Sequence, residues 1–114
     1  LPLRPDPLDR PRQVVDPAHG RQAVTSFRVL RRLQSRTLVE FHPLTGRTHQ
    51  LRVHSAHTHG LGIPICGDPI YGSSASAPRL CLHAASITFR HPVSHESLSF
   101  TSSIAFDPFE SDLT

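Results

Sequence analysis

The chain has 114 residues, of which 37% are hydrophobic and 11 are proline. A chain of this size forms one small domain, or part of a larger one, with room for one modest core. The frequent prolines exclude long helices, and no apolar run approaches the roughly 20 residues needed to cross a membrane. We therefore expect an α+β protein of the cytoplasm that has no membrane partner.

All 12 basic residues are arginine, and the formal net charge is +3. Three of the nine acidic residues, Asp107, Glu110 and Asp112, lie close to the end, so the rest of the chain is more basic than the total implies. A guanidinium group presents a planar fork of donors that matches phosphate, which favours a polyanion as a partner. The chain has no methionine and begins with Leu1, and we expect it to be a fragment of a longer protein.

The first 33 residues predict an arm followed by a strand. Residues 1–22 are proline-rich and lack periodicity, which indicates an extended arm with turns near Pro5 and Gly20. Residues 23–33 and 36–41 are strand-like, and their short separator predicts a β-hairpin.

Residues 48–59 have helical spacing, with Thr45 or Thr48 as the expected N-cap and Gly60 as the expected end. Residues 79–89 begin like a helix and end as a strand over Ser86–Arg90, which we expect to pair with 98–103. The sheet and helices therefore occupy 23–106, and 107–114 form an acidic tail.

Arg47 and Arg52 lie in the stretch GRTHQLR, near the expected helix start. Free backbone N–H groups at such a start favour anions, so one of these arginines could fix a carboxylate or phosphate. The alternative is two solvated arginines on an exposed helix. Asp68, in GDP, is more often a residue that caps a turn than a catalytic carboxylate.

Histidines at 49, 54, 57 and 59 raise the alternative of a metal site. His54 and His57 have the spacing that places two ligands on one helix face, but the chain has no HExxH motif and no obvious second ligand pair. We therefore expect no metal, and histidines that contact RNA or the core. Cys66 and Cys81 read as free thiols of a reducing compartment.

Three blocks, PLTGRTHQLRVHSAH, GIPICGDPIYG and RLCLHAASITFRHP, occur in an order and spacing that resemble the C-terminal half of the RluA-like pseudouridine synthases. The resemblance covers residues 1 to about 106. It implies the C-terminal half of a mixed, mostly antiparallel sheet with short helices. It also implies an enzyme that isomerises uridine to pseudouridine in ribosomal or transfer RNA without a cofactor.

The family's catalytic aspartate lies in an HRLDxxTSG motif, which this sequence does not contain. By the resemblance, Arg52 pairs with that aspartate and orients it, so the chain alone should be inactive. Four residues are expected to contact RNA or to shape the pocket wall: Arg47, Thr48, His49 and Gln50. Leu82 and His83 are expected to support this wall.

The expected partners are RNA and the missing N-terminal half of the domain. Without that half, exposed apolar strands should make the chain associate with itself. Two other hypotheses stay open: a non-catalytic RNA-binding module of the same fold, and a small histidine-dependent metal protein.

Overall fold

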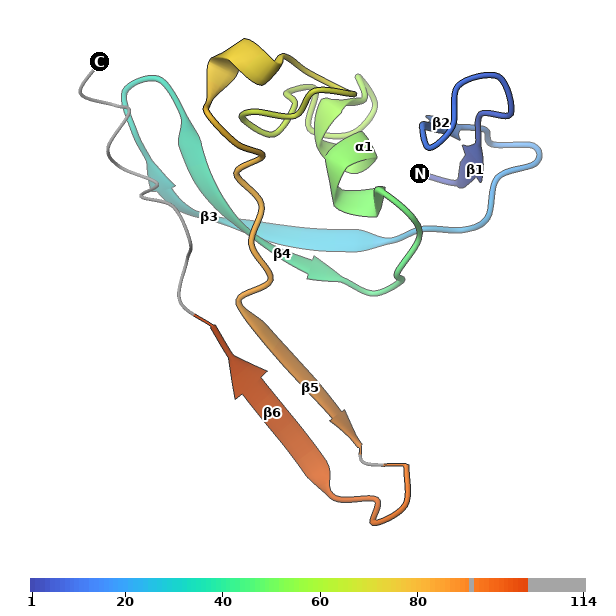
Figure 1. Ribbon diagram of the computed structural model, residues 1–114, viewed down its shortest axis with the longest axis vertical. Helices are drawn as coiled ribbons and strands as arrows, with labels where there is room; N and C mark the ends of the chain where they lie inside the picture. Colours follow the sequence, from blue (N-terminus) through green and yellow to red (C-terminus); the bar gives the residue numbers. More distant parts are fainter. Residues whose placement is uncertain (91, 103–114) are drawn as a thin grey trace. The chain divides into compact units, whose positions relative to one another are not determined.

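A computed structural model describes residues 1–90 and 92–102 and divides the chain into two units, Leu1–Cys81 and Leu82–Thr114 (Figure 1). The strands are β1 (Leu3–Pro5), β2 (Gln13–Val15), β3 (Thr25–Arg32), β4 (Thr37–Pro43), β5 (Ser86–Arg90) and β6 (Ser97–Thr101). The helices are α1 (Gln50–Ala56) and the 3₁₀ helix η1 (Ser74–Ser76). In the described ranges, no helix is long and apolar enough to cross a membrane.

Every strand pairing among the described residues is antiparallel: β1 with β2, β3 with β4, and β5 with β6. The expectation of an α+β fold with mostly antiparallel strands is confirmed. The strands form three separate two-stranded sheets rather than one continuous sheet.

Residues 1–22 contain the β1–β2 hairpin, whereas the sequence predicted an extended arm. Leu3 is buried and forms the core of the first unit with Ala23 and Val53, against which Val15 and Tyr71 also pack. The backbone N–H of Leu3 donates to the carbonyl of Arg21 at 2.9 Å, and the N–H of Arg21 donates back to Leu3 at 2.7 Å. The segment is therefore integral to the core, because Leu3 of β1 is buried in it and Val15 of β2 packs against it.

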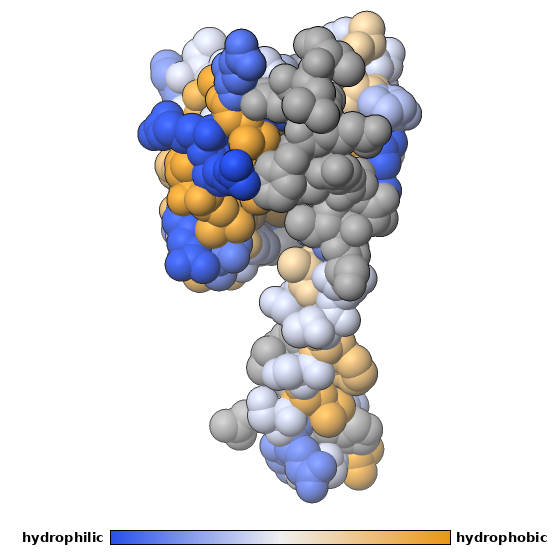
Figure 2. Space-filling view, turned by 90° about the vertical axis from the view of Figure 1, so that its left-hand side faces the viewer, coloured by the Kyte–Doolittle hydropathy of each residue, from blue (hydrophilic) through white to orange (hydrophobic). Residues whose placement is uncertain are grey.

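The predicted hairpin of residues 23–33 and 36–41 is confirmed as β3–β4, closed by a hydrogen bond from Leu33 N–H to Arg36 O at 2.8 Å. Its register shifts between Val29 and Arg31. Phe27, Val29 and Leu30 are each 41–49% exposed although they lie in a strand. Figure 2 faces the end of this hairpin and shows hydrophobic residues between hydrophilic ones there.

Helix α1 is shorter than the predicted 48–59 and runs only from Gln50 to Ala56, in contact with β2 and β3. The predicted caps are wrong: His49 is the N-cap residue, with a left-handed backbone and no side-chain cap hydrogen bond. Thr45 instead accepts a hydrogen bond from the N–H of Val24 and donates one to the side chain of Gln50. The helix ends because His57 adopts an extended backbone, three residues before Gly60.

In the second unit, β5 confirms the predicted strand over Ser86–Arg90, and β6 lies one residue earlier than predicted at its start. The predicted helical start of 79–89 is wrong, since residues 80–85 form no helix. The N–H of Cys81 donates to Cys66 O at 2.9 Å, a contact within the first unit. Residues 107–114, the predicted acidic tail, lie outside the described residues.

Candidate functional site

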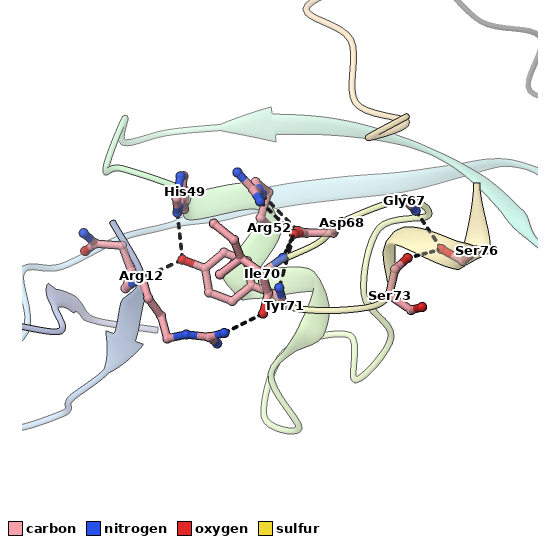
Figure 3. Close-up of polar contacts among 10 residues, drawn as sticks. Arg12, His49, Arg52, Gly67, Asp68, Ile70, Tyr71, Ser73 and Ser76 are labelled. Carbon is pink, nitrogen blue, oxygen red and sulfur yellow. Dashed lines mark hydrogen bonds and ion pairs between the residues drawn. The ribbon is translucent and has the colours of Figure 1, made fainter. Parts of the chain in front are cut away.

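The side chain of Arg52 forms a bidentate ion pair with Asp68. Its Nε donates to Oδ2 at 2.9 Å and its Nη2 donates to Oδ1 at 2.7 Å (Figure 3). Arg52 is 13% exposed and Asp68 is fully buried. This geometry uses two of the five N–H groups of the guanidinium and fixes its plane, so the remaining groups point in a defined direction.

The pKa values of the pair follow from these contacts. Burial opposes ionisation of Asp68, but hydrogen bonds from Arg52 and from the backbone N–H groups of Tyr71 and Ile70 hold its pKa below the ordinary value. The hydrogen bond to Asp68 raises the pKa of Arg52 despite burial. Both groups are therefore charged at neutral pH, and each compensates the burial of the other.

A tight turn places Asp68 under Arg52. Oδ1 of Asp68 accepts hydrogen bonds from Ile70 N–H at 3.0 Å and Tyr71 N–H at 3.2 Å, which confirms the predicted turn-capping role. Gly67 has a positive φ of 76°, and an added Cβ would overlap the carbonyl of Arg79. Glycine is required here because a side chain disfavours positive φ and would also clash with this carbonyl.

Tyr71 lies at the centre of the site. Its hydroxyl oxygen accepts from the backbone N–H of Gln13 at 2.9 Å and lies 2.8 Å from Nδ1 of His49. The guanidinium carbons of Arg12 and Arg52 lie 5.3 and 5.4 Å from its ring centroid, within the range of cation–π attraction. Burial raises the pKa of the Tyr71 hydroxyl, so it stays protonated at neutral pH.

Arg12 ties the N-terminal hairpin to the same turn. Its Nη2 donates to the carbonyl of Ile70 at 2.7 Å. Tyr71 and Val53 also line a shallow cleft of about 370 Å³ next to β2. The hairpin that the sequence predicted as an arm therefore helps to position the turn carrying Asp68 and Tyr71.

Gln50 is buried, and the hydrogen bonds of its side-chain amide lie within the chain. Oε1 accepts from Arg47 N–H at 3.0 Å and from the Thr45 hydroxyl at 2.6 Å. Nε2 donates to Val24 O and to the Thr25 hydroxyl, both at 2.9 Å. A side-chain amide can donate two hydrogen bonds and its oxygen can accept two, so all four hydrogen bonds of Gln50 are made. These bonds join the GRTHQ turn to β3.

The other predicted residues of this segment lie nearby. Nε of Arg47 donates to Gln22 O at 2.9 Å, which supports the backbone, and Thr48 is exposed. His49 is half-buried and contacts Tyr71. Leu82 and His83 begin the second unit, and their predicted support of the pocket wall stays a prediction.

His54 is a structural histidine. Nδ1 lies 2.9 Å from the Thr25 hydroxyl and Nε2 lies 2.9 Å from Leu1 O, so both ring nitrogens are occupied. Burial lowers the pKa of His54. Across residues 1–90 and 92–102, no group of three or more histidine, cysteine or acidic side chains is arranged to hold a metal ion.

Sequence reasoning missed the partner of Arg52 and the role of Tyr71. It placed the acidic partner of Arg52 outside the chain, whereas the structure provides one inside it, Asp68. The two residues are 16 positions apart on a helix and a turn, so neither periodicity nor spacing could join them. The available signal was Asp68 itself, an acid within the apolar stretch PICGDPIY that would need a cationic partner if buried.

Comparison with known proteins adds the family context. The family described as RNA pseudouridylate synthase matches residues 3–57. The dual-specificity RNA pseudouridine synthase RluA of Haemophilus ducreyi is 46% identical over 93% of this chain and 48% of its own length. The same-named protein of Pasteurella multocida is also 46% identical, over 93% of this chain and 49% of its own length.

A more distant relative is the ribosomal large subunit pseudouridine synthase D of Xanthomonas campestris. It is 37% identical over 93% of this chain and 35% of its own length. The chain spans about half the length, or less, of these curated relatives.

Proposed function

Because the chain belongs to the RluA-like family of RNA pseudouridine synthases, we propose that it is part of an enzyme that isomerises uridine to pseudouridine. The substrate would be ribosomal or transfer RNA, the two kinds of RNA that the sequence resemblance implies. No cofactor is needed, since the uracil base detaches from the ribose and rejoins it through carbon. Such an enzyme works where those RNAs are, which places it in the cytoplasm.

The observation that carries the proposal is the fixed guanidinium of Arg52. Two of its N–H groups bind Asp68, and within the described ranges its other N–H groups have no hydrogen-bonded acceptor and remain for a second one. We assign that acceptor to the catalytic aspartate of the family, which acts on the ribose side of the glycosidic bond. Asp68 then orients Arg52, and Arg52 holds the aspartate ionised and correctly turned.

The aspartate is not among these 114 residues by the family's motif, because no acidic residue here follows Arg-Leu. We therefore propose that the chain alone binds RNA without turning it over. Arg47, Thr48, His49 and Gln50 would shape the wall beside Arg52. The exposed Arg32 of the β3–β4 hairpin would supply sequence-independent attraction to phosphate.

Tritium release tests this function directly. When carbon 5 of uracil bonds to the ribose, its hydrogen leaves, so RNA made with 5-tritiated uridine releases tritium to water. A longer protein that contains this chain and an HRLD segment should release tritium, and the 114-residue chain alone should bind the RNA without release. Release of tritium by the 114-residue chain alone would contradict the proposal that the catalytic aspartate lies outside this chain.

A second candidate is a non-catalytic RNA-binding module, favoured by the fact that Arg52 already has a carboxylate partner inside the chain. It predicts that the longer protein also binds RNA but releases no tritium.

A further inference from the structure

His49 has an unusual backbone for its residue type. Its φ is 54° and its ψ is 19°, in the left-handed region that non-glycine residues rarely adopt. Strained backbone of this kind is often retained where it aims a side chain. The side chain lies beside Arg52, and one ring nitrogen contacts Tyr71 (Figure 3).

The hydrogen bonds around Tyr71 determine which nitrogen of His49 carries the proton. The Tyr71 oxygen already accepts from Gln13 N–H. Its own proton needs an acceptor, and Nδ1 of His49 at 2.8 Å is the acceptor that the described residues provide. A Tyr71 hydroxyl that donates to Nδ1 leaves the proton of the neutral ring on Nε2.

The neutral form of His49 is favoured. Burial lowers the pKa of His49, and the positive charge of Arg52 lowers it further. The Nε2–H group is on the side of the ring away from Tyr71, and within the described part of the chain it has no acceptor. Arg52 and His49 therefore present N–H donors next to each other, with Tyr71 behind both.

We propose that Tyr71 is a positioning residue that locks His49 as an Nε2–H donor, and that this donor binds an acceptor oxygen of the RNA beside Arg52. This rests on the proposed function for its ligand class, which is an oxygen of uridine or of its phosphate. Two residues that are 22 positions apart, His49 and Tyr71, would thus act as one unit in substrate binding.

The tautomer is tested without RNA and without catalysis. Long-range nitrogen–proton NMR spectra of the labelled chain above pH 7 distinguish the two neutral forms of each imidazole. His49 should show the Nε2–H pattern in the native chain, and Tyr71→Phe, which removes only the hydroxyl, should give a mixture of both forms. The imidazole signal of His49 is identified as the one that disappears in His49→Asn. A native Nδ1–H form, or a pattern unchanged in Tyr71→Phe, would overturn the lock.

The RNA contact is tested with the same variants and a short RNA hairpin that has uridines in its loop. Asparagine tolerates the left-handed backbone and its Oδ1 can still accept from Tyr71, but it has no donor at the position of Nε2. His49→Asn should therefore keep the fold and weaken binding by about three- to ten-fold, the effect of one hydrogen bond. Tyr71→Phe should weaken binding less, and His59→Ala, an exposed control, should not change it.

Equal affinity of His49→Asn and the native chain would overturn the RNA contact. The outcomes separate the two proposals. A longer protein that releases no tritium would refute the proposed function, whereas the NMR pattern and the binding loss would stand for an RNA-binding module. Release of tritium together with a native Nδ1–H form would refute only the inference about His49 and Tyr71.

Discussion

The replacement of Asp68 by asparagine tests how much the buried ion pair stabilises the first unit. The change keeps the shape of the side chain, and its Oδ1 can still accept from Ile70 and Tyr71. It removes the negative charge beneath Arg52 and leaves a guanidinium that is only 13% exposed without a counter-charge. The loss is therefore mainly electrostatic rather than a loss of packing.

The expected magnitude follows from the burial of both partners. Removing one partner of a buried ion pair typically destabilises a protein by about 3–5 kcal/mol, and the retained backbone hydrogen bonds place Asp68→Asn near the lower end. With a urea slope of about 1.5 kcal/mol per molar, a loss of about 3 kcal/mol lowers the midpoint by roughly 2 M. This is a large part of the stability of a small domain, which is about 5–15 kcal/mol.

The chain provides both a probe and a matched control. It has no tryptophan and one tyrosine, so tyrosine fluorescence during urea unfolding reports on Tyr71 alone. Glu40→Gln removes the charge from another arginine–carboxylate pair, with Arg28, in which the arginine is 68% exposed. Exposed pairs contribute little, so this control should leave the midpoint almost unchanged. Equal midpoints for Asp68→Asn and Glu40→Gln would refute the reasoning.

Three further predictions concern stability and association. The pKa of Asp68 is lowered in the folded chain, so the stability that its ionised form contributes is complete above about pH 4 and is lost as pH falls through the folded pKa. Urea midpoints measured from about pH 7 to pH 2 should therefore fall with pH, and they should fall less steeply in Asp68→Asn. Gly67→Ala should destabilise the folded chain by at least roughly 2 kcal/mol, because its Cβ overlaps Arg79 O. The loss should exceed that of Gly62→Ala, where φ is also positive but the space is open, and equal losses of stability would contradict the overlap. The exposed apolar side chains of β3, Phe27 among them, should make the chain associate, so sedimentation should show a mass that rises with concentration, and a constant monomer mass would exclude this.

Local structure was predictable where sequence pattern and physical cause coincide. The alternation of apolar and polar residues and the short separator were sufficient for the β3–β4 hairpin, and the strand at Ser86–Arg90 was found in the same way. The start of α1 was not predictable. Its N-cap residue is His49, which has a left-handed backbone, and not the predicted Thr45 or Thr48.

The candidate site was predictable only in part. The donors in GRTHQLR indicated that Arg47 or Arg52 could fix a carboxylate or phosphate, and Arg52 forms an ion pair with Asp68. The identity of the partner was not predictable, because it depends on how a turn folds under a helix. The role of Tyr71 was also hidden, since a tyrosine after GDP carries no pattern that distinguishes a hydrogen-bonding centre from a core residue.

The central claim is that Arg52 orients a catalytic aspartate while Asp68 holds it in place. Arg52→Lys, made in the longer protein that contains this chain, tests it most directly. Lysine keeps a positive charge against Asp68 but replaces the planar fork by a point charge, which cannot face two carboxylates in a fixed geometry. The account predicts that tritium release falls by roughly 10²-fold or more, as expected when a catalytic group is misplaced, while the affinity for RNA changes less than about threefold. Native turnover in Arg52→Lys, or an equal loss of turnover and affinity, would contradict it.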